Sequence, residues 1–239
     1  MKLVKLCLLS LTALFGAAVH AQTADEIITK HIDATGGKDK LAAINSIRLE
    51  NTMNVMDNDA ASTTIVLNGK GYRSESDFGG QKLIQVVTDK GGWAVNPFGG
   101  SAEPAAMPDD QYKAGVSQLF IVPFLNYAAR GEKAELLGKE KVGNVDAYKL
   151  KLTSKDNVAS TYYIDPATYY IVQTVRSADM GGQMVNVTTS FSDFKKSDYG
   201  WVVPQSTQVN FGDQFSMTAK VKKMEINVPV DAAVFEMKK

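Results

Sequence analysis

The spacing of the hydrophobic residues changes once along the chain, near residue 44. Before that point Ile28 and Ile32 lie one helical turn apart, within a segment, Ala24–Thr35, whose first turn is acidic. This spacing predicts an amphipathic helix, and acidic residues suit the positive end of its dipole. Gly36-Gly37 is typical of a helix end. We expect a second, shorter helix over residues 38–44.

After residue 44 the hydrophobic residues mostly alternate with polar ones, which is typical of strands with one face exposed to water. In the clearest example Leu150 and Leu152 alternate with Lys149 and Lys151. We expect about ten strands, over residues 47–55, 63–67, 72–76, 83–88, 148–152, 162–164, 169–175, 185–191, 202–211 and 217–226.

The connections between these strands predict an antiparallel meander. Asp165-Pro166 places Asp first and Pro second, the order that a type I turn prefers, and Gly79-Gly80 and Gly143-Asn144 suit tight hairpins. Connections of this length leave no room for a crossover helix, so neighbouring strands should run antiparallel.

The last strand predicts a bend in the sheet. Met217, Ala219 and Val221 share one parity, whereas Met224 has the other. A slip of one residue at Lys222-Lys223 predicts a β-bulge, which bends a strand and curves its sheet. The expected fold class is mainly β (α+β): an incomplete antiparallel β-barrel of about ten or eleven strands, with N-terminal and inserted helices covering the concave face.

Residues 91–132 interrupt the strand pattern. A Gly- and Pro-rich stretch over residues 96–108 predicts a loop, and the apolar residues between 119 and 125 predict a helical piece. No linker or repeat divides the chain, so we expect residues 22–239 to form a single domain.

The first 21 residues resemble a secretory signal. Lys2 and Lys5 precede an apolar run over residues 6–19, and a small-x-small pattern ends at Ala21, where we expect cleavage. The run is shorter than the roughly 20 residues that span a bilayer. Cys7 lies inside the run rather than behind a lipoprotein cleavage box. We therefore expect an exported, soluble periplasmic protein without a lipid anchor.

Removal of this segment narrows the chemistry open to the protein. The chain has 26 basic and 26 acidic residues, and removal of Lys2 and Lys5 leaves 24 basic residues against 26 acidic ones. A chain with this slightly negative net charge does not attract a polyanion. No cysteine and one histidine, His31, then remain, too few for a thiolate nucleophile or a Cys/His metal site. We expect no nucleic-acid partner, no metal and no cofactor, and interpret His31 as a half-buried helix residue.

No group of residues predicts an active site. The Gly-Gly pairs lie between strands, whereas a phosphate-binding loop joins a strand to a helix. Nothing in the sequence selects two of the scattered Asp and Glu residues as a pair for glycoside cleavage. We expect no enzymatic activity, and a hydrolase built on scattered carboxylates is the least favoured alternative.

The covered concave face is the candidate site. If its helical cover is loose, the space beneath it can hold a ligand. Nine methionines, eight of them after residue 21, suit a surface that repacks around acyl chains, although the same residues could fill an ordinary core. The predicted ligand contacts are Leu67, Ile84, Val86, Leu150, Leu152, Val187 and Phe211 on the sheet, with Leu119, Phe120 and Phe124 in the cover.

Six segments, residues 24–41, 92–98, 137–150, 162–169, 191–204 and 226–235, follow a recognisable order and spacing. They include the stretches GWAVNPF and YYIDPATY. Together they resemble the periplasmic lipoprotein-carrier superfamily with the LolA/LolB-like fold, and more closely its Bacteroidetes-type outer membrane lipoprotein-sorting branch.

The resemblance implies an incomplete barrel of about eleven strands with an apolar interior. It implies no cofactor and a role in carrying acylated lipoproteins or related lipids between membranes. It also implies an arginine that steadies the lid, for which Arg48 and Arg73 are the candidates. The implied partners are lipid or lipoprotein acyl chains and envelope proteins of the inner and outer membranes, bound by a monomer. The alternative is a non-catalytic envelope interaction or structural module on the same fold, with a filled interior.

Overall fold

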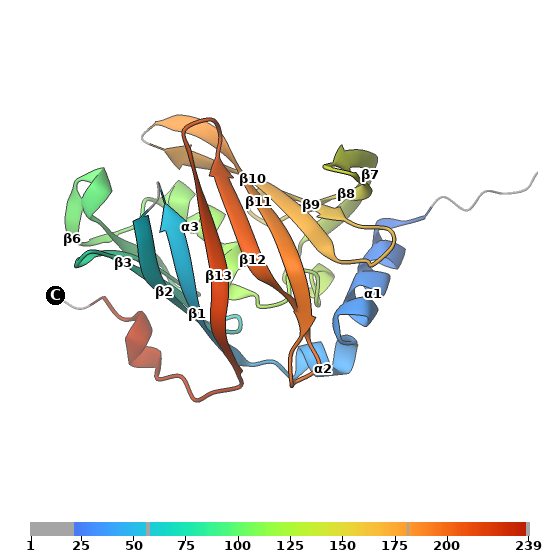
Figure 1. The fold of residues 1–239 in the computed structure, drawn as a ribbon, viewed down its shortest axis with the longest axis horizontal. Helices are drawn as coiled ribbons and strands as arrows, with labels where there is room; N and C mark the ends of the chain where they lie inside the picture. Colours follow the sequence, from blue (N-terminus) through green and yellow to red (C-terminus); the bar gives the residue numbers. More distant parts are fainter. Residues whose placement is uncertain (1–21, 56–57, 181, 238–239) are drawn as a thin grey trace, which may run out of the picture.

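The structure is a computed structural model and describes residues 22–55, 58–180 and 182–237. The expected signal segment, residues 1–21, lies outside the described residues. Figure 1 shows one long curved sheet, with two short helices near the start of the chain beside one end of it. No helix in the described ranges is both long enough and apolar enough to cross a bilayer.

Helix α1 (Ala24–Thr35) has the predicted bounds. Thr23 Oγ1 accepts a hydrogen bond from the Glu26 amide at 3.2 Å, and Glu26 Oε2 accepts one from the Thr23 amide at 3.0 Å. This capping box satisfies two amides that the helix start leaves without partners. Gly36 ends α1 with a φ of 151°, a conformation open to glycine. Helix α2 (Lys38–Ala42) follows and is two residues shorter than expected.

The described residues form one sheet of 13 antiparallel strands. Their order is β6-β5-β4-β3-β2-β1-β13-β12-β11-β10-β9-β8-β7, so the first and last strands of the chain pair at its centre. The free edges are β6 and β7, and the barrel is therefore incomplete. The strands are β1 (Ser46–Val55), β2 (Asn58–Leu67), β3 (Gly71–Phe78), β4 (Gln81–Thr88), β5 (Gly92–Asn96), β6 (Ser101–Ala106), β7 (Lys133–Val142), β8 (Val145–Thr153), β9 (Ala159–Ile164), β10 (Ile171–Met180), β11 (Gln183–Lys196), β12 (Val202–Phe211) and β13 (Phe215–Ile226).

All ten predicted strands are present, and the three additional ones, β5, β6 and β7, lie at or next to the edges of the sheet. The loop expected over residues 96–108 contains β6, a short edge strand with Pro104 in it. Proline is tolerated at an edge because one side of the strand needs no amide donor. Strand β7 is rich in Lys and Glu, which protect an edge from further pairing but obscure the alternation.

The predicted turns connect the strands as expected. Gly79 and Gly80 join β3 to β4 with φ values of 64° and 92°, and Gly143 joins β7 to β8 with a φ of 57°. Between β9 and β10, Asp165 Oδ1 accepts a hydrogen bond from the Ala167 amide at 2.8 Å. Short connections of this kind produce the meander.

The predicted β-bulge in β13 is confirmed. Glu50 of β1 pairs with Lys223 and the next residue, Asn51, pairs with Val221, so Lys222 has no partner in the register. Because of the extra residue, odd-numbered side chains face the inner side before the bulge and even-numbered ones face it afterwards. Val221 and Met224 consequently face the same side.

The segment between β6 and β7 differs from the prediction. Helix α3 (Asp109–Gly115) and the 3₁₀ turn η2 (Val116–Leu119) come first, and the expected helical piece after Leu119 is irregular. Pro123 has no amide hydrogen for a helical bond, and Asn126 has a left-handed φ of 56°. These residues are apolar because they are packed against other elements. A second 3₁₀ turn, η3 (Ala128–Arg130), leads into β7.

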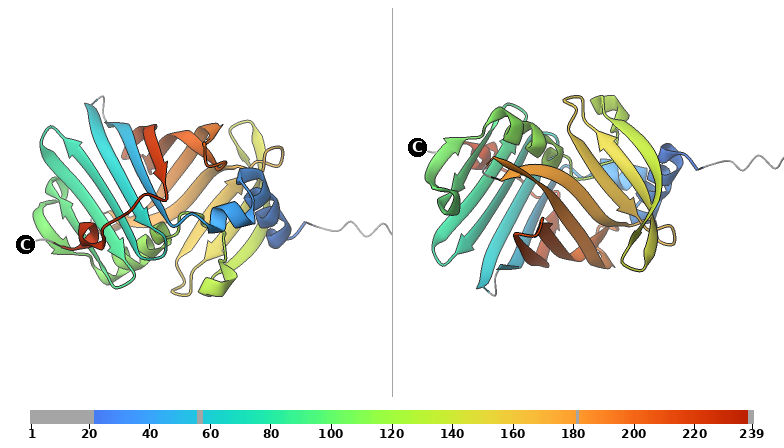
Figure 2. Two further views of the ribbon diagram at one scale, coloured as in Figure 1. Left: turned by 90° about the horizontal axis from the view of Figure 1, so that it is seen from below. Right: turned by 90° about the horizontal axis from the view of Figure 1, so that it is seen from above.

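Side chains pack on both faces of the sheet. The inner face carries α1, α2 and the segment of residues 107–132, hereafter the insert; there Ile27 and Phe124 pack on β8 and β9, and Leu41 packs on β1 and β2. On the outer face, Phe235 of the C-terminal 3₁₀ turn η4 (Ala232–Phe235) packs against Val86. Figure 2 shows α1 and α2 at the end of the sheet away from the C-terminus.

Candidate ligand-binding site

The inner face of the sheet is not filled along its whole length. Between it and the insert lies a hollow of about 1860 Å³. Pockets for small ligands usually measure ~300–1,000 Å³, so this space is large enough for more than one hydrocarbon chain. Its larger apolar lining residues include Ile47, Leu49, Met53, Val55, Phe78, Phe98, Phe120, Phe191, Phe211, Phe215, Met217 and Met224.

Strand alternation explains why this lining is apolar. In β1, Leu49 and Met53 line the hollow, whereas Arg48 and Glu50 form an ion pair on the outer face. Successive side chains of a strand point to opposite faces, so one parity serves the ligand site and the other meets water.

The bulge at Lys222 extends the apolar wall along β13. Met217, Ala219 and Val221 line the hollow from one parity, and Met224 lines it from the other. A regular strand would turn Met224 outward, because a shift of one residue moves a side chain to the opposite face.

The insert covers the hollow and is fixed to the sheet. Gly69 in the β2–β3 turn donates its amide to the Leu119 carbonyl at 2.8 Å, and Asn68 Oδ1 accepts a hydrogen bond from the Ile121 amide at 3.2 Å. Tyr112 of α3 donates its hydroxyl to the Thr88 carbonyl at 3.1 Å. The insert is thus a tethered wall of the site.

Arg130 holds the irregular part of the insert in shape. Its guanidinium donates to the carbonyls of Pro123 and Leu125, and pairs with Glu132 at 2.7 Å. The same group lies over the Phe120 ring, with 4.1 Å between the guanidinium carbon and the ring centre. One side chain therefore fixes both the backbone of the cover and an aromatic ring that lines the hollow.

The two ends of the hollow differ. At the α1–α2 end, Ile27, Leu41 and Phe124 are almost completely buried and close the space. At the other end Phe98 lines the hollow although it is 62% exposed, and it packs edge-on against Phe78 with 5.6 Å between ring centres. The hollow is therefore open to solvent beside these two rings.

Of the predicted ligand contacts, Phe120 and Phe211 line the hollow with their side chains. Ile84 borders it as well, but its register opposite Glu75 turns the side chain to the outer face, where it packs against the Val86 cluster. Val187 has the inner-face parity and lies between Arg176 and Phe211, but it is buried beneath the lining.

The other predicted contacts do not line the hollow. Leu67 and Val86 lie on the outer face beneath Phe235, because β3–β5 are covered by apolar residues on both faces and alternation there does not select one. Leu150 and Leu152 do face inward, but α1 and Phe124 occupy the space above them. The remaining two, Leu119 and Phe124, are packing residues beside the site.

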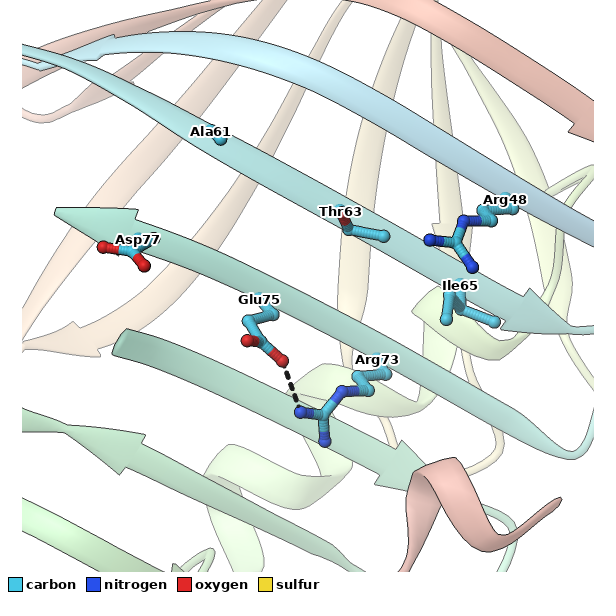
Figure 3. A pocket seen from close by; sticks show the side chains of 7 residues that line it. All are labelled: Arg48, Ala61, Thr63, Ile65, Arg73, Glu75 and Asp77. Carbon is cyan, nitrogen blue, oxygen red and sulfur yellow. Dashed lines mark hydrogen bonds and ion pairs between the residues drawn. The ribbon is translucent and has the colours of Figure 1, made fainter. Parts of the chain in front are cut away.

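The two predicted lid arginines lie on the outer face, contrary to expectation. Arg48 and Arg73 line a groove of about 330 Å³ together with Glu75. Figure 3 shows these three side chains on strands β1 and β3. Arg73 pairs with Glu75 at 2.5 Å and donates to the Val234 carbonyl at 3.3 Å. Arg73 therefore holds the C-terminal segment against the sheet.

His31 is more deeply buried than predicted. Its Nδ1 lies 2.8 Å from the Tyr169 carbonyl, and its ring packs edge-on against Phe124 at 5.7 Å. Burial lowers the pKa of His31 below its ordinary value of 6.5, against the opposing effect of the Tyr169 hydrogen bond. The residue is a neutral part of the closed end of the site.

The polar groups of the hollow were not among the contacts that the sequence predicted. Arg176 of β10 and Tyr162 of β9 line it, and so does Gln118, whose buried Oε1 has no hydrogen-bond partner in the described part of the chain. Burial raises the pKa of Tyr162 to about 12, so the phenol stays protonated at neutral pH. The inner-face parity of residues 174 and 176 was the available signal for Arg176.

No protein-family model and no curated protein sequence matches the chain. Solved structures do. A LolA superfamily protein from Nitrosomonas europaea has a TM-score of 0.57 and 13% identity, over 92% of this chain and 99% of that one. A domain from Vibrio parahaemolyticus, described as an outer membrane lipoprotein-sorting protein domain, has a TM-score of 0.55 and 12% identity, over 88% and 94%.

A third similar structure is a DUF1329 family protein from Desulfovibrio piger, with a TM-score of 0.53 and 13% identity, over 90% of this chain and 98% of that one. At these identities the likeness concerns the fold. The chain has the incomplete-barrel fold of LolA superfamily and outer membrane lipoprotein-sorting structures.

Proposed function

We propose that this protein is a periplasmic carrier that binds lipid or the acyl chains of a lipoprotein in the hollow and performs no covalent chemistry. The observation that carries the proposal is an apolar hollow of about 1860 Å³ that reaches solvent beside Phe98. The likeness in fold to a structure described as a lipoprotein-sorting domain supports it. The signal-like pattern of residues 1–21 supports export.

The lining fits hydrocarbon better than a rigid ligand. Met53, Met107, Met217 and Met224 all line the hollow, and the flexible thioether side chain adapts to ligands of different shape. Each buried CH₂ group contributes about 0.8 kcal/mol, equivalent to roughly a fourfold gain in affinity. A carrier of this kind selects its ligands by chain length and shape.

A matched pair of double variants tests the proposal. Thr207 and Ala219 face each other across β12 and β13 and both line the hollow, whereas the adjacent pair Gln208 and Thr218 points to the outer face. Thr207→Trp/Ala219→Trp should fill part of the hollow, and Gln208→Trp/Thr218→Trp should leave it open.

The readout is titration of the delipidated protein with a fluorescent fatty acid, followed by displacement with saturated fatty acids of 12, 14 and 16 carbons. We expect affinity to rise with chain length in the wild type and the outer-face variant, and to fall at least tenfold in the inner-face variant. No uptake by the wild type, or equal uptake by both variants, contradicts a carrier that uses this hollow.

A further inference from the structure

Arg176 is the one basic residue among the described residues that line the hollow. It lies in β10, opposite Ser160 of β9 and Val187 of β11. Its guanidinium makes no hydrogen bond or ion pair with any residue in the described ranges, and its side chain is exposed to the hollow. A cation placed on an apolar wall without a partner is available to a ligand.

The two acidic residues of the lining do not neutralise Arg176. Asp59 Oδ1 accepts a hydrogen bond from Asn54 Nδ2 at 2.9 Å, and Asp179 Oδ1 accepts one from the Gly182 amide at 2.7 Å. Both carboxylates are thus engaged at strand ends. Within the ranges that the structure describes, no ion pair joins Arg176 to either carboxylate.

A second polar group without a partner lies beside Arg176. Tyr162 is 7% exposed and lines the hollow, and its hydroxyl makes no hydrogen bond within the described part of the chain. This oxygen is not among the fully buried polar atoms that lack a partner, so it reaches the space of the hollow, where it can donate to a ligand. Tyr162 pairs with Thr174, two residues before Arg176 on the same face of β10, so the phenol and the guanidinium are diagonal neighbours across two strands.

Strand β3, on the opposite wall of the hollow, also approaches Arg176. Tyr72 of β3 and Arg176 of β10 line the same hollow, although five strands lie between β3 and β10 in the sheet. Six strand spacings of ~4.8 Å would separate the two residues by ~29 Å on a flat sheet, so the curvature brings the walls together around Arg176.

We propose that Arg176 and Tyr162 bind the oxyanion of an amphiphile, a carboxylate or a phosphate at the end of a hydrocarbon chain that fills the apolar part of the hollow. The inference rests on the proposed carrier function and adds the ligand class. A guanidinium donates to carboxylate and phosphate in a bidentate manner, and a phenol adds one further donor.

The experiment compares ligands that share one chain: oleate and oleoyl lysophosphatidate carry the anion, and oleyl alcohol does not. Each displaces a fluorescent fatty acid from wild type, Arg176→Gln, Tyr162→Phe and the control Arg48→Gln, which changes an arginine on the outer face. Inorganic phosphate alone is added as a competitor to detect binding of the anion without a chain.

We expect Arg176→Gln to weaken both anionic ligands about tenfold, as loss of a charge-assisted hydrogen bond predicts, and to leave oleyl alcohol unchanged. Tyr162→Phe should weaken the anions several-fold, and Arg48→Gln should weaken neither class. Equal loss of anionic and neutral ligands in Arg176→Gln, or no loss at all, overturns the inference while leaving the carrier function intact. A wild type that binds none of the three ligands refutes the carrier function. Competition by inorganic phosphate alone would show an anion site that needs no hydrocarbon chain, and this result also overturns the inference.

Discussion

The guanidinium of Arg130 lies 4.1 Å above the ring of Phe120, while the same group hydrogen-bonds to two carbonyls of the insert. The cover of the hollow therefore depends on one cation that has little access to water. Arg130 and its partner Glu132 have side chains that are 17% and 11% exposed. This arrangement makes the cover sensitive to a single substitution.

Arg130→Met should lower the free energy of unfolding by about 3 kcal/mol, because removal of one partner leaves the Glu132 carboxylate buried and unpaired. Urea unfolding followed by circular dichroism measures the change. The double variant Arg130→Met/Glu132→Leu should regain part of the loss, since no unpaired charge remains. A single variant as stable as the wild type would show that this pair does not hold the insert.

Gly71→Ala should loosen the C-terminal segment from the outer face. A Cβ added at Gly71 would lie 2.7 Å from the Phe235 ring, whereas one added at Gly91 meets nothing within 4 Å. Overpacking of this kind costs about 1–3 kcal/mol. We expect a lower free energy of unfolding for Gly71→Ala and little change for Gly91→Ala.

The fluorescence of Trp93 gives a second measurement of the same event, because Trp93 Nε1 donates a hydrogen bond to the Phe235 carbonyl at 2.8 Å. The emission should shift to longer wavelength in Gly71→Ala only. Identical stability and emission in the two glycine variants would contradict the packing described for η4.

His31 should make the protein less stable as the pH falls from 7 to 5. Burial lowers the pKa of His31 in the folded state below 6.5, so below that pH the unfolded chain binds a proton that the folded chain resists. The slope is at most about 1.4 kcal/mol per pH unit for one group.

The test is urea unfolding of residues 22–239 at several pH values, with His31→Gln as the comparison. The paired carboxylates Glu75 and Glu140 have lowered pKa values and titrate below this window. His31→Gln should therefore lose the pH slope between 7 and 5. A slope that persists in this variant assigns the effect to another group.

Deletion of both Lys222 and Lys223 should damage the wall of the hollow, because Met224 then directly follows Val221 and the two side chains point to opposite faces. We expect a loss of about 1.5–3 kcal/mol of unfolding free energy, comparable to exposing one large apolar side chain, together with weaker binding of a fluorescent fatty acid. Deletion of Lys222 alone removes the bulge but leaves Val221 and Met224 two residues apart on the same face, so this variant should bind as the wild type does. Normal binding by the double deletion would show that the side to which Met224 points does not shape the site.

Local sequence patterns predicted much of this fold because each reflects a local physical preference. The Gly36-Gly37 end of α1, the hairpin glycines and the parity slip at Lys222 all have the predicted consequences. The edge strands were missed because pairing on one side leaves short or charged sequences such as those of β6 and β7. The apolar residues around Phe124 resembled a helix because burial alone makes a segment apolar.

The site was harder to predict than the fold. The alternation of side chains in β1 was enough to assign Arg48 to the outer face and its neighbour Leu49 to the hollow. Alternation could not separate Val86 from Gln85, because η4 covers one face of β4 and the hollow lies on the other. The role proposed for Arg176 depends on curvature that brings β10 and β3 to the same hollow, a long-range relationship that no short segment encodes.

The most direct measurement is native mass spectrometry of the protein exported to a bacterial periplasm and purified without detergent, with extraction and identification of any bound lipid. A carrier with an open apolar hollow should show masses above that of the bare chain, and these should disappear in Thr207→Trp/Ala219→Trp but persist in Gln208→Trp/Thr218→Trp. A bare-chain mass alone, together with no uptake of a fluorescent fatty acid by the same sample, would contradict it.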